Sequence, residues 1–187
     1  MTRQPEFLNH THVQLVDGVP PNTVGSEKIV YKVTDGMHIF AAKIFRRHNV
    51  ADNSPINRSK RAQEEFTAYH RYRDSTIAQY VPFPVDLIRE HNKPVGLLVE
   101  WKDGQPIREY YHRTPVPVEL INVLEQHLLT LPEDLWIGQD CMDAYNICLG
   151  PQGLWFAELM YNDHLYSLQE YRQEVYRWMD ILREEYV

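Results

Sequence analysis

The sequence has few cysteines, no long apolar run and fewer basic than acidic residues, and each shortage excludes a class of protein. Cys141 and Cys148 are the two cysteines among 187 residues. Two are too few for a disulfide scaffold, so we expect reduced thiols. No apolar run reaches the ~20 residues of a membrane helix, and the N-terminus lacks the apolar core of a cleaved signal peptide. We therefore predict no membrane span and a cytoplasmic location.

The charge balance argues against general affinity for nucleic acid. The chain has 19 Lys and Arg against 26 Asp and Glu, a net charge of -7, whereas phosphate-backbone binding rests on clustered basic residues. The nine histidines show no zinc-binding spacing. One local basic run is interpreted as a solvated helix entrance; it consists of Arg46, Arg47, Arg58, Lys60 and Arg61.

Strand patterns fill the first part of the chain after a flexible tail at residues 1–11. Alternating β-branched and aromatic residues predict strands at 12–19, 29–34 and 37–45, and Asp35-Gly36 predicts a two-residue turn between the last two. A three-stranded antiparallel meander follows from this order.

One helix and two more strands complete the first half. Ser54-Pro55 is a start signal for a helix over 56–73, and strands are predicted at 86–89 and 95–101. The result is five strands with one helix inserted after the third.

The second half changes to helical periodicity. Apolar residues at helical spacing predict helices at 118–131 and 165–185, with Glu125 on the polar face of the first. Between them, 140–158 contains two short apolar runs around Gly-Pro-Gln-Gly, which predicts a β-hairpin.

Lys43 stands inside the apolar strand MHIFAAKIF. A lysine in such a run must extend to an edge or meet an anion. Glu64 or Glu65 on the following helix can supply that anion. The alternative is that both glutamates are solvated and Lys43 lies at a strand edge.

The stretch from Asp140 to Glu158 carries the residue types of phosphoryl transfer. Such a site needs a carboxylate near the attacking hydroxyl, and an Asn plus a further acid to hold magnesium. Asp140, Asn146 and Glu158 follow this order across the predicted hairpin. A plain turn and hairpin without chemistry is the alternative.

The order of these elements, together with AAKIF, QEEFTAYHRYRD and GLLVEW, resembles the protein-kinase-like fold over about residues 12–185. The resemblance implies an α+β, two-lobed domain. Its N-lobe, residues 12–101, would hold the five-stranded antiparallel sheet and one αC-type helix. Residues 102–187 would form a truncated helical C-lobe.

The resemblance also implies a site for ATP with Mg²⁺ or Mn²⁺. Lys43 would contact the phosphates, and Glu65 would orient it, with Glu64 in reserve. The remaining implied roles are adenine contact by the backbone of Glu100 and Trp101, metal binding by Asn146 and Glu158, and orientation or deprotonation of the acceptor hydroxyl by Asp140.

Several motifs depart from the family pattern. Gly18 and Gly25 bracket a poorly kept glycine-rich loop, and Gly138-Gln139-Asp140 stands where His-Arg-Asp is usual. Glu158-Leu159-Met160 replaces Asp-Phe-Gly. The short second half resembles the minimal kinase effectors that some pathogenic bacteria deliver into host cells, which would place the protein in a host cytoplasm.

Three functional hypotheses follow. The chain is an atypical ATP-dependent phosphotransferase acting on a protein or small-molecule hydroxyl, a pseudokinase that binds a protein partner, or an unrelated α+β binding domain. The third predicts that Lys43 and Glu65 do not meet. The second predicts that Asp140→Ala leaves function unchanged.

Overall fold

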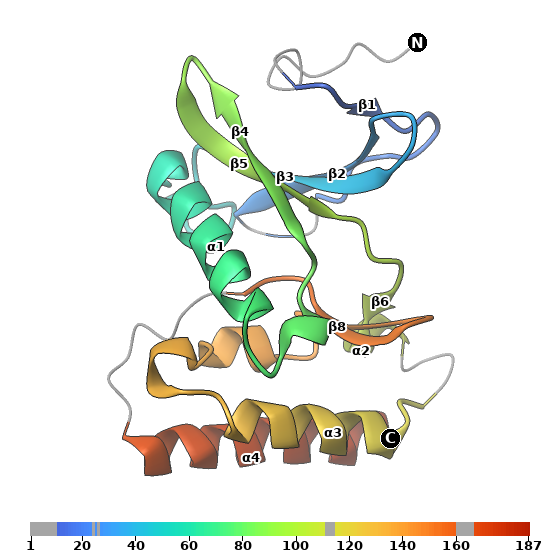
Figure 1. The fold of residues 1–187 in the computed structure, drawn as a ribbon, viewed down its shortest axis with the longest axis vertical. Helices are drawn as coiled ribbons and strands as arrows, with labels where there is room; N and C mark the ends of the chain where they lie inside the picture. The colour runs from blue at the N-terminus through green and yellow to red at the C-terminus, as the bar shows by residue number, and fades with distance from the viewer. Residues whose placement is uncertain (1–10, 24, 26, 111–114, 160–166) are drawn as a thin grey trace. The chain divides into compact units, whose positions relative to one another are not determined.

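The computed structural model describes residues 11–23, 25, 27–110, 115–159 and 167–187. Its first half forms a five-stranded antiparallel sheet in the order β1-β2-β3-β5-β4 (Figure 1). A helix, α1, follows the third strand and packs on this sheet, so the α+β class and the predicted order are confirmed. The predicted N-terminal tail lies outside the described residues except for Thr11. The bounds are β1 Gln14–Leu15, β2 Lys28–Thr34, β3 Ile39–Phe45, α1 Arg58–Arg73, β4 Pro84–Glu90 and β5 Lys93–Glu100.

The chain divides into two compact units. The first comprises Met1–Thr67 and Phe83–Trp101, and the second comprises Ala68–Pro82 and Lys102–Val187. The boundary between the two units therefore falls at three places: inside α1, before β4 and after β5.

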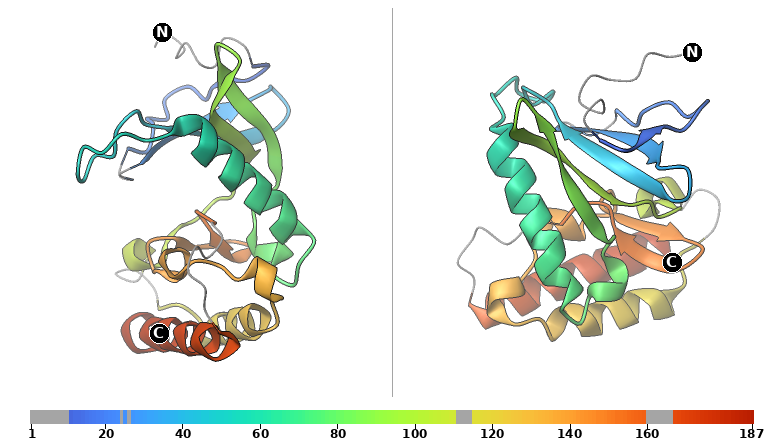
Figure 2. Two further views of the ribbon diagram at one scale, coloured as in Figure 1. Left: turned by 90° about the vertical axis from the view of Figure 1, so that its left-hand side faces the viewer. Right: turned by 45° about the horizontal axis from the view of Figure 1, so that its top comes forward.

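The two faces of the five-stranded sheet differ in what covers them. Side chains alternate between faces, and the register Tyr31↔Ala42 puts one set on a face that carries an apolar cluster. The opposite face, which carries Lys43, is covered by α1 (Figure 2). The buried members of the apolar cluster are Val13, Val33, Ala42, Ile44, Ile88, Val95 and Leu98.

The turn between β2 and β3 is longer than predicted. Thr34 pairs with Ile39, so the loop has four residues and β3 starts later than 37. The carboxylate of Asp35 accepts hydrogen bonds from the backbone of Met37 at 2.8 Å and His38 at 2.7 Å. Because the side chain of Asp35 engages these amides, they do not pair across the hairpin.

Helix α1 also starts later than Ser54-Pro55 suggested. Pro55 forms an isolated bridge with His48, and the side chain of Asn57 accepts a hydrogen bond from the backbone N–H of Lys60 at 3.2 Å. Asn57 thus satisfies a free amide of the first turn, as helix-capping residues do.

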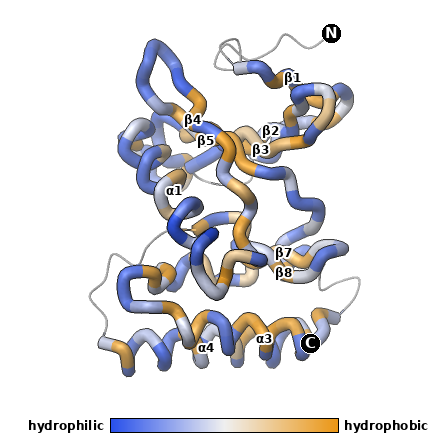
Figure 3. The backbone as a smooth tube through the Cα atoms, viewed as in Figure 1, coloured by the Kyte–Doolittle hydropathy of each residue, from blue (hydrophilic) through white to orange (hydrophobic). Residues whose placement is uncertain are grey.

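The second unit contains two packed helices, α3 and α4. Apolar side chains at helical spacing form its core, and the rings of Trp136 and Tyr171 stack at 4.7 Å between centroids. Hydrophobic and hydrophilic residues alternate along the backbone of both helices (Figure 3). Glu125 was predicted on the polar face of α3, yet it is 9% exposed. Its carboxylate accepts a 2.6 Å bond from Arg183 of α4, which explains its burial. The helices are α2 Ile107–Tyr110, α3 Val118–Leu129 and α4 Leu168–Tyr186.

A small second sheet, in the order β6-β7-β8, lies in the same unit. The predicted hairpin is confirmed by β7 and β8, which pair from Ile147↔Phe156 to Gly150↔Gly153. The added strand β6 was not predicted. Its bounds are Gln105–Pro106, and those of the hairpin are Ile147–Gly150 and Gly153–Phe156.

In the described part of the chain, no helix combines the length and the apolar character needed to cross a membrane.

Candidate functional site

A buried ion pair joins Lys43 of β3 to Glu65 of α1. The distance from Nζ of Lys43 to Oε1 of Glu65 is 3.3 Å, and the residues are 5% and 1% exposed. The exposed Glu64 instead lies 3.6 Å from Lys60 on the outer side of the helix. Of the two glutamates considered from the sequence, Glu65 is therefore the one that meets Lys43.

The neighbouring strand holds the backbone of Lys43 in place. Lys43 lies opposite Leu97 of β5, and the next residue along β5 towards its start is Gly96. A Cβ atom on Gly96 would overlap the carbonyl oxygen of Lys43 and approach Ile44. Only a glycine at this position lets the two strands run as close as they do.

The same carboxylate binds a second lysine, which sequence reasoning missed. Nζ of Lys28, the first residue of β2, lies 2.8 Å from Oε2 of Glu65, and Lys28 is 8% exposed. Its ammonium group also lies 5.2 Å from the ring centroid of Phe45. The position of Lys28 beside Glu65 follows from its pairing with Phe45 across β2 and β3. No motif in the sequence predicts this pairing.

Asp140, Asn146 and Glu158 belong to the second unit, around the β7–β8 hairpin. Asp140 lies exposed in a short 3-10 helix, Gln139–Met142. Nδ2 of Asn146 donates a 2.7 Å hydrogen bond to the backbone oxygen of Asp140. Because the amide donates through its nitrogen, its oxygen Oδ1 is the atom that can act as a metal ligand.

Pairing in the hairpin also places the backbone of Glu158 close to that of Asn146. The backbone N–H of Ala157 donates to the carbonyl oxygen of Asn146 at 2.7 Å, and Glu158 follows directly. The donor set of an amide oxygen and a carboxylate suits a hard cation such as Mg²⁺. Among the described residues, no group of three or more His, Cys, Asp or Glu is arranged to hold a metal. Met160, the third residue of the predicted metal motif, lies outside them.

Adenine contact was predicted at Glu100, the last residue of β5, and at Trp101, which follows it. The backbone N–H of Glu100 donates to the carbonyl oxygen of Phe83 at 2.8 Å, and that of Trp101 donates to Ile39 at 3.2 Å. Nζ of Lys32 lies over the ring of Trp101, 4.5 Å from its centroid. Both amide hydrogens are thus engaged in backbone hydrogen bonds within the first unit.

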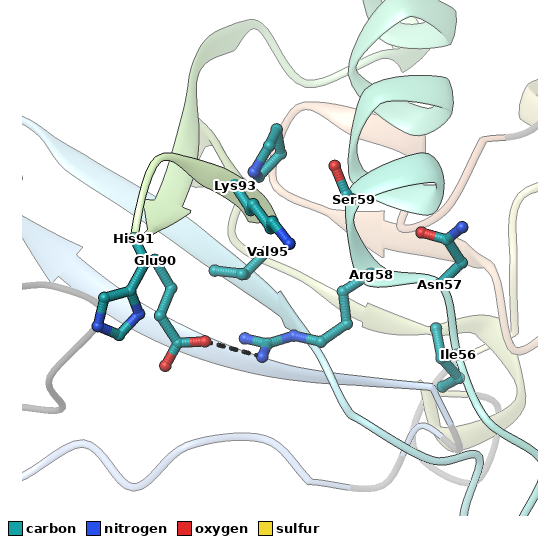
Figure 4. A pocket seen from close by; sticks show the side chains of 9 residues that line it. Ile56, Asn57, Arg58, Ser59, Glu90, His91, Lys93 and Val95 are labelled. Carbon is teal, nitrogen blue, oxygen red and sulfur yellow. Dashed lines mark hydrogen bonds and ion pairs between the residues drawn. The ribbon is translucent and has the colours of Figure 1, made fainter.

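A cavity of about 410 Å³ lies in the first unit, between the start of α1 and the β4–β5 turn (Figure 4). Arg58 pairs with Glu90 at 2.9 Å beside it. Arg61 of the same helix pairs with Glu27 at 2.7 Å. The basic run interpreted as a solvated helix entrance therefore includes two arginines held in partly buried ion pairs. The other residues around the cavity are Ile56, Asn57, Ser59, His91, Lys93, Pro94 and Val95.

Both cysteines, Cys141 and Cys148, are buried and form no disulfide bond. No protein-family model matches the chain, and no curated protein matches it in sequence.

Proposed function

We propose that this protein is a minimal, divergent kinase-like protein that binds ATP with magnesium and transfers the γ-phosphoryl group to a hydroxyl of a protein or small molecule. The buried ion pair of Lys43 with Glu65 is the observation that supports this proposal best. Burying charged groups is costly, and this pair joins the two residues to which the kinase-like resemblance assigns phosphate contact and orientation of the lysine.

Lys43 would bind the phosphates, and Glu65 would hold its ammonium group in the right orientation. A fixed cation near transferring phosphates lowers the barrier because its position costs no reorganisation during the reaction. The amide oxygen of Asn146 and the carboxylate of Glu158 would hold the magnesium ion. When bound, that ion neutralises charge on the phosphates.

Asp140 would orient the acceptor hydroxyl or accept its proton. Its exposed carboxylate is accessible to an acceptor, and the hydrogen bond from Asn146 to its carbonyl oxygen ties this residue to the metal-binding amide. A base must come within hydrogen-bond reach of the proton that it takes, and a fixed loop favours such positioning.

A pseudokinase that binds a protein partner is the second candidate. The engaged amides of Glu100 and Trp101 favour it, because they remove two donors that a bound adenine would use. The Gly138-Gln139-Asp140 loop and Glu158 in place of an aspartate point in the same direction.

Thermal unfolding with ATP, with and without Mg²⁺ or Mn²⁺, tests the proposal. A ligand that binds only the folded state raises the midpoint with its occupancy. We expect metal-dependent stabilisation of the wild type that Lys43→Ala abolishes, whereas Asp140→Ala keeps the stabilisation and loses transfer. No shift at millimolar nucleotide contradicts nucleotide binding. Binding without detectable transfer to any hydroxyl favours the pseudokinase.

A further inference from the structure

The start of β2 lies on the same sheet face as Lys43. Val30 pairs with Lys43, and Lys28 is two residues before Val30. Residues two apart along a strand share a face, so the side chains of Lys28 and Lys43 both project towards α1. The two ammonium groups occupy opposite oxygens of the Glu65 carboxylate, at 2.8 Å and 3.3 Å.

Lys28 is held firmly in this position. Its chain neighbour Glu27 pairs with Arg61 of α1 at 2.7 Å, and Lys28 pairs with Glu65 one turn further along the same helix. The backbone carbonyl of Glu27 also accepts a 2.8 Å hydrogen bond from Arg46. A group fixed by its surroundings before binding loses little freedom on binding.

In the described part of the loop that precedes β2, residues 19–22 offer no backbone N–H group to a phosphate. The N–H of Val19 donates to Val16 at 3.4 Å, and that of Asn22 donates to Val30 at 2.8 Å. Pro20 and Pro21 have no N–H group. Four consecutive residues of this loop are therefore unable to bind phosphate through the backbone, the usual means in glycine-rich loops.

We propose that Lys28 is a second phosphate-contacting lysine, and that the two lysines on Glu65 bind a di- or triphosphate chain. This inference rests on the proposed function and names the part of the ligand that its site recognises. Each ammonium group is a cation that carries N–H donors, the chemistry that phosphate oxygens require. Two cations on adjacent oxygens of one carboxylate suit neighbouring phosphates of one chain, and side-chain charge replaces the missing loop amides.

Calorimetric titration with Mg-ATP, adenosine and inorganic tripolyphosphate tests this assignment on the wild type, Lys28→Met and Lys60→Met. Lys60 is a matched control because it carries the same charge on α1 with a side chain 68% exposed. We expect Lys28→Met to weaken ATP and tripolyphosphate binding about ten- to a hundredfold, the effect of one hydrogen bond between charged groups. Adenosine affinity stays unchanged, and Lys60→Met behaves as wild type.

The outcomes separate this inference from the proposed function. If Lys43→Ala abolishes ATP binding and Lys28→Met does not weaken it, the role of Lys28 is overturned and the proposed function stands. If Lys28→Met weakens ATP and adenosine equally, Lys28 is structural and the inference fails. If the wild type binds tripolyphosphate through Lys28 but has no preference for ATP, the nucleotide function fails and the phosphate site stands. If it binds neither, both fail.

A charge-keeping variant guards against a folding defect. Lys28→Arg retains the cation and the ion pair with Glu65, so we expect near-wild-type ATP affinity from it. Should Lys28→Met not fold, Lys28→Gln takes its place in the same titrations. Loss of ATP binding in a folded Lys28→Arg protein would overturn the charge argument.

Discussion

The ammonium group of Lys28 lies 2.8 Å from Oε2 of Glu65, in a cluster that is almost fully removed from water. The carboxylate of Glu65 thus binds two ammonium groups, one from each of the neighbouring strands β2 and β3.

Replacing that carboxylate should be severely destabilising. In Glu65→Ala two ammonium groups stay buried without it, and breaking a buried ion pair from one side costs about 3–5 kcal/mol. Urea unfolding measures the loss. The neighbouring Glu64→Ala is the control, because Glu64 is exposed and its pair with Lys60 is worth less than about 1 kcal/mol. Equal losses from the two substitutions would contradict the asymmetry.

Gly96→Ala should disturb Lys43 without touching its side chain. The added methyl group overlaps the carbonyl oxygen of Lys43, so β3 and β5 must separate. Overpacking of this kind costs about 1–3 kcal/mol, and we expect weaker ATP binding along with a lower unfolding midpoint. Gly25→Ala is the stability control, since its Cβ would meet only the oxygen of Lys28 at 3.6 Å. An unchanged unfolding midpoint for Gly96→Ala would show that β3 and β5 can move apart without loss of stability.

The ion pair between α3 and α4 should contribute to the stability of the second unit. Nη2 of Arg183 donates to Glu125 at 2.6 Å and Nη1 to Asp180 at 2.8 Å. The bond to Glu125 raises the pKa of Arg183 further. We expect Glu125→Ala to cost about 1–3 kcal/mol, because Arg183 loses a charged acceptor.

Arg177→Ala is its matched control, as that side chain is 62% exposed and 3.4 Å from Glu174. A double-mutant cycle of Glu125 and Arg183 isolates the coupling between them. A coupling of zero would mean that this ion pair does not stabilise the packing of α3 against α4.

Stability should fall in acid through Asp35. Hydrogen bonds from the backbone of His38 and Met37 lower the pKa of this carboxyl from 3.8 to about 2. Because the folded-state pKa is below the unfolded one, the contribution is complete above about pH 4 and is lost as pH falls towards 2. Melting temperatures of wild type and Asp35→Asn, followed from pH 6 to pH 2, should converge. A difference that stays constant over this range would assign the effect to the turn geometry.

The order of strands and helices was predictable because each element carries its own periodicity. For Lys43 the residues alone left open an anion on the helix or a strand edge, and the choice of Glu65 over Glu64 came from the family resemblance. The position of Lys28 was not predictable, since a lysine at a strand start beside Glu27 has the pattern of a solvated edge. The prediction that Glu125 lies on the polar face was wrong for a related reason. Helical periodicity assigns a glutamate to that face and carries no information about an arginine 58 residues later. Strand β6 is too short for any alternation to show.

The division of the chain inside α1 affects how the protein is made. Residues 68–82 belong to the second unit, although most of that unit is encoded after residue 101. Tyr69 and Tyr72 emerge from the ribosome early, whereas the carbonyl groups that they bind, on Ala157 and Trp136, follow more than sixty residues later. During synthesis these aromatic side chains have no native surface to pack on. When synthesis has reached Trp101, all residues of the first unit are present, whereas the part of α1 that belongs to the second unit still lacks most of that unit.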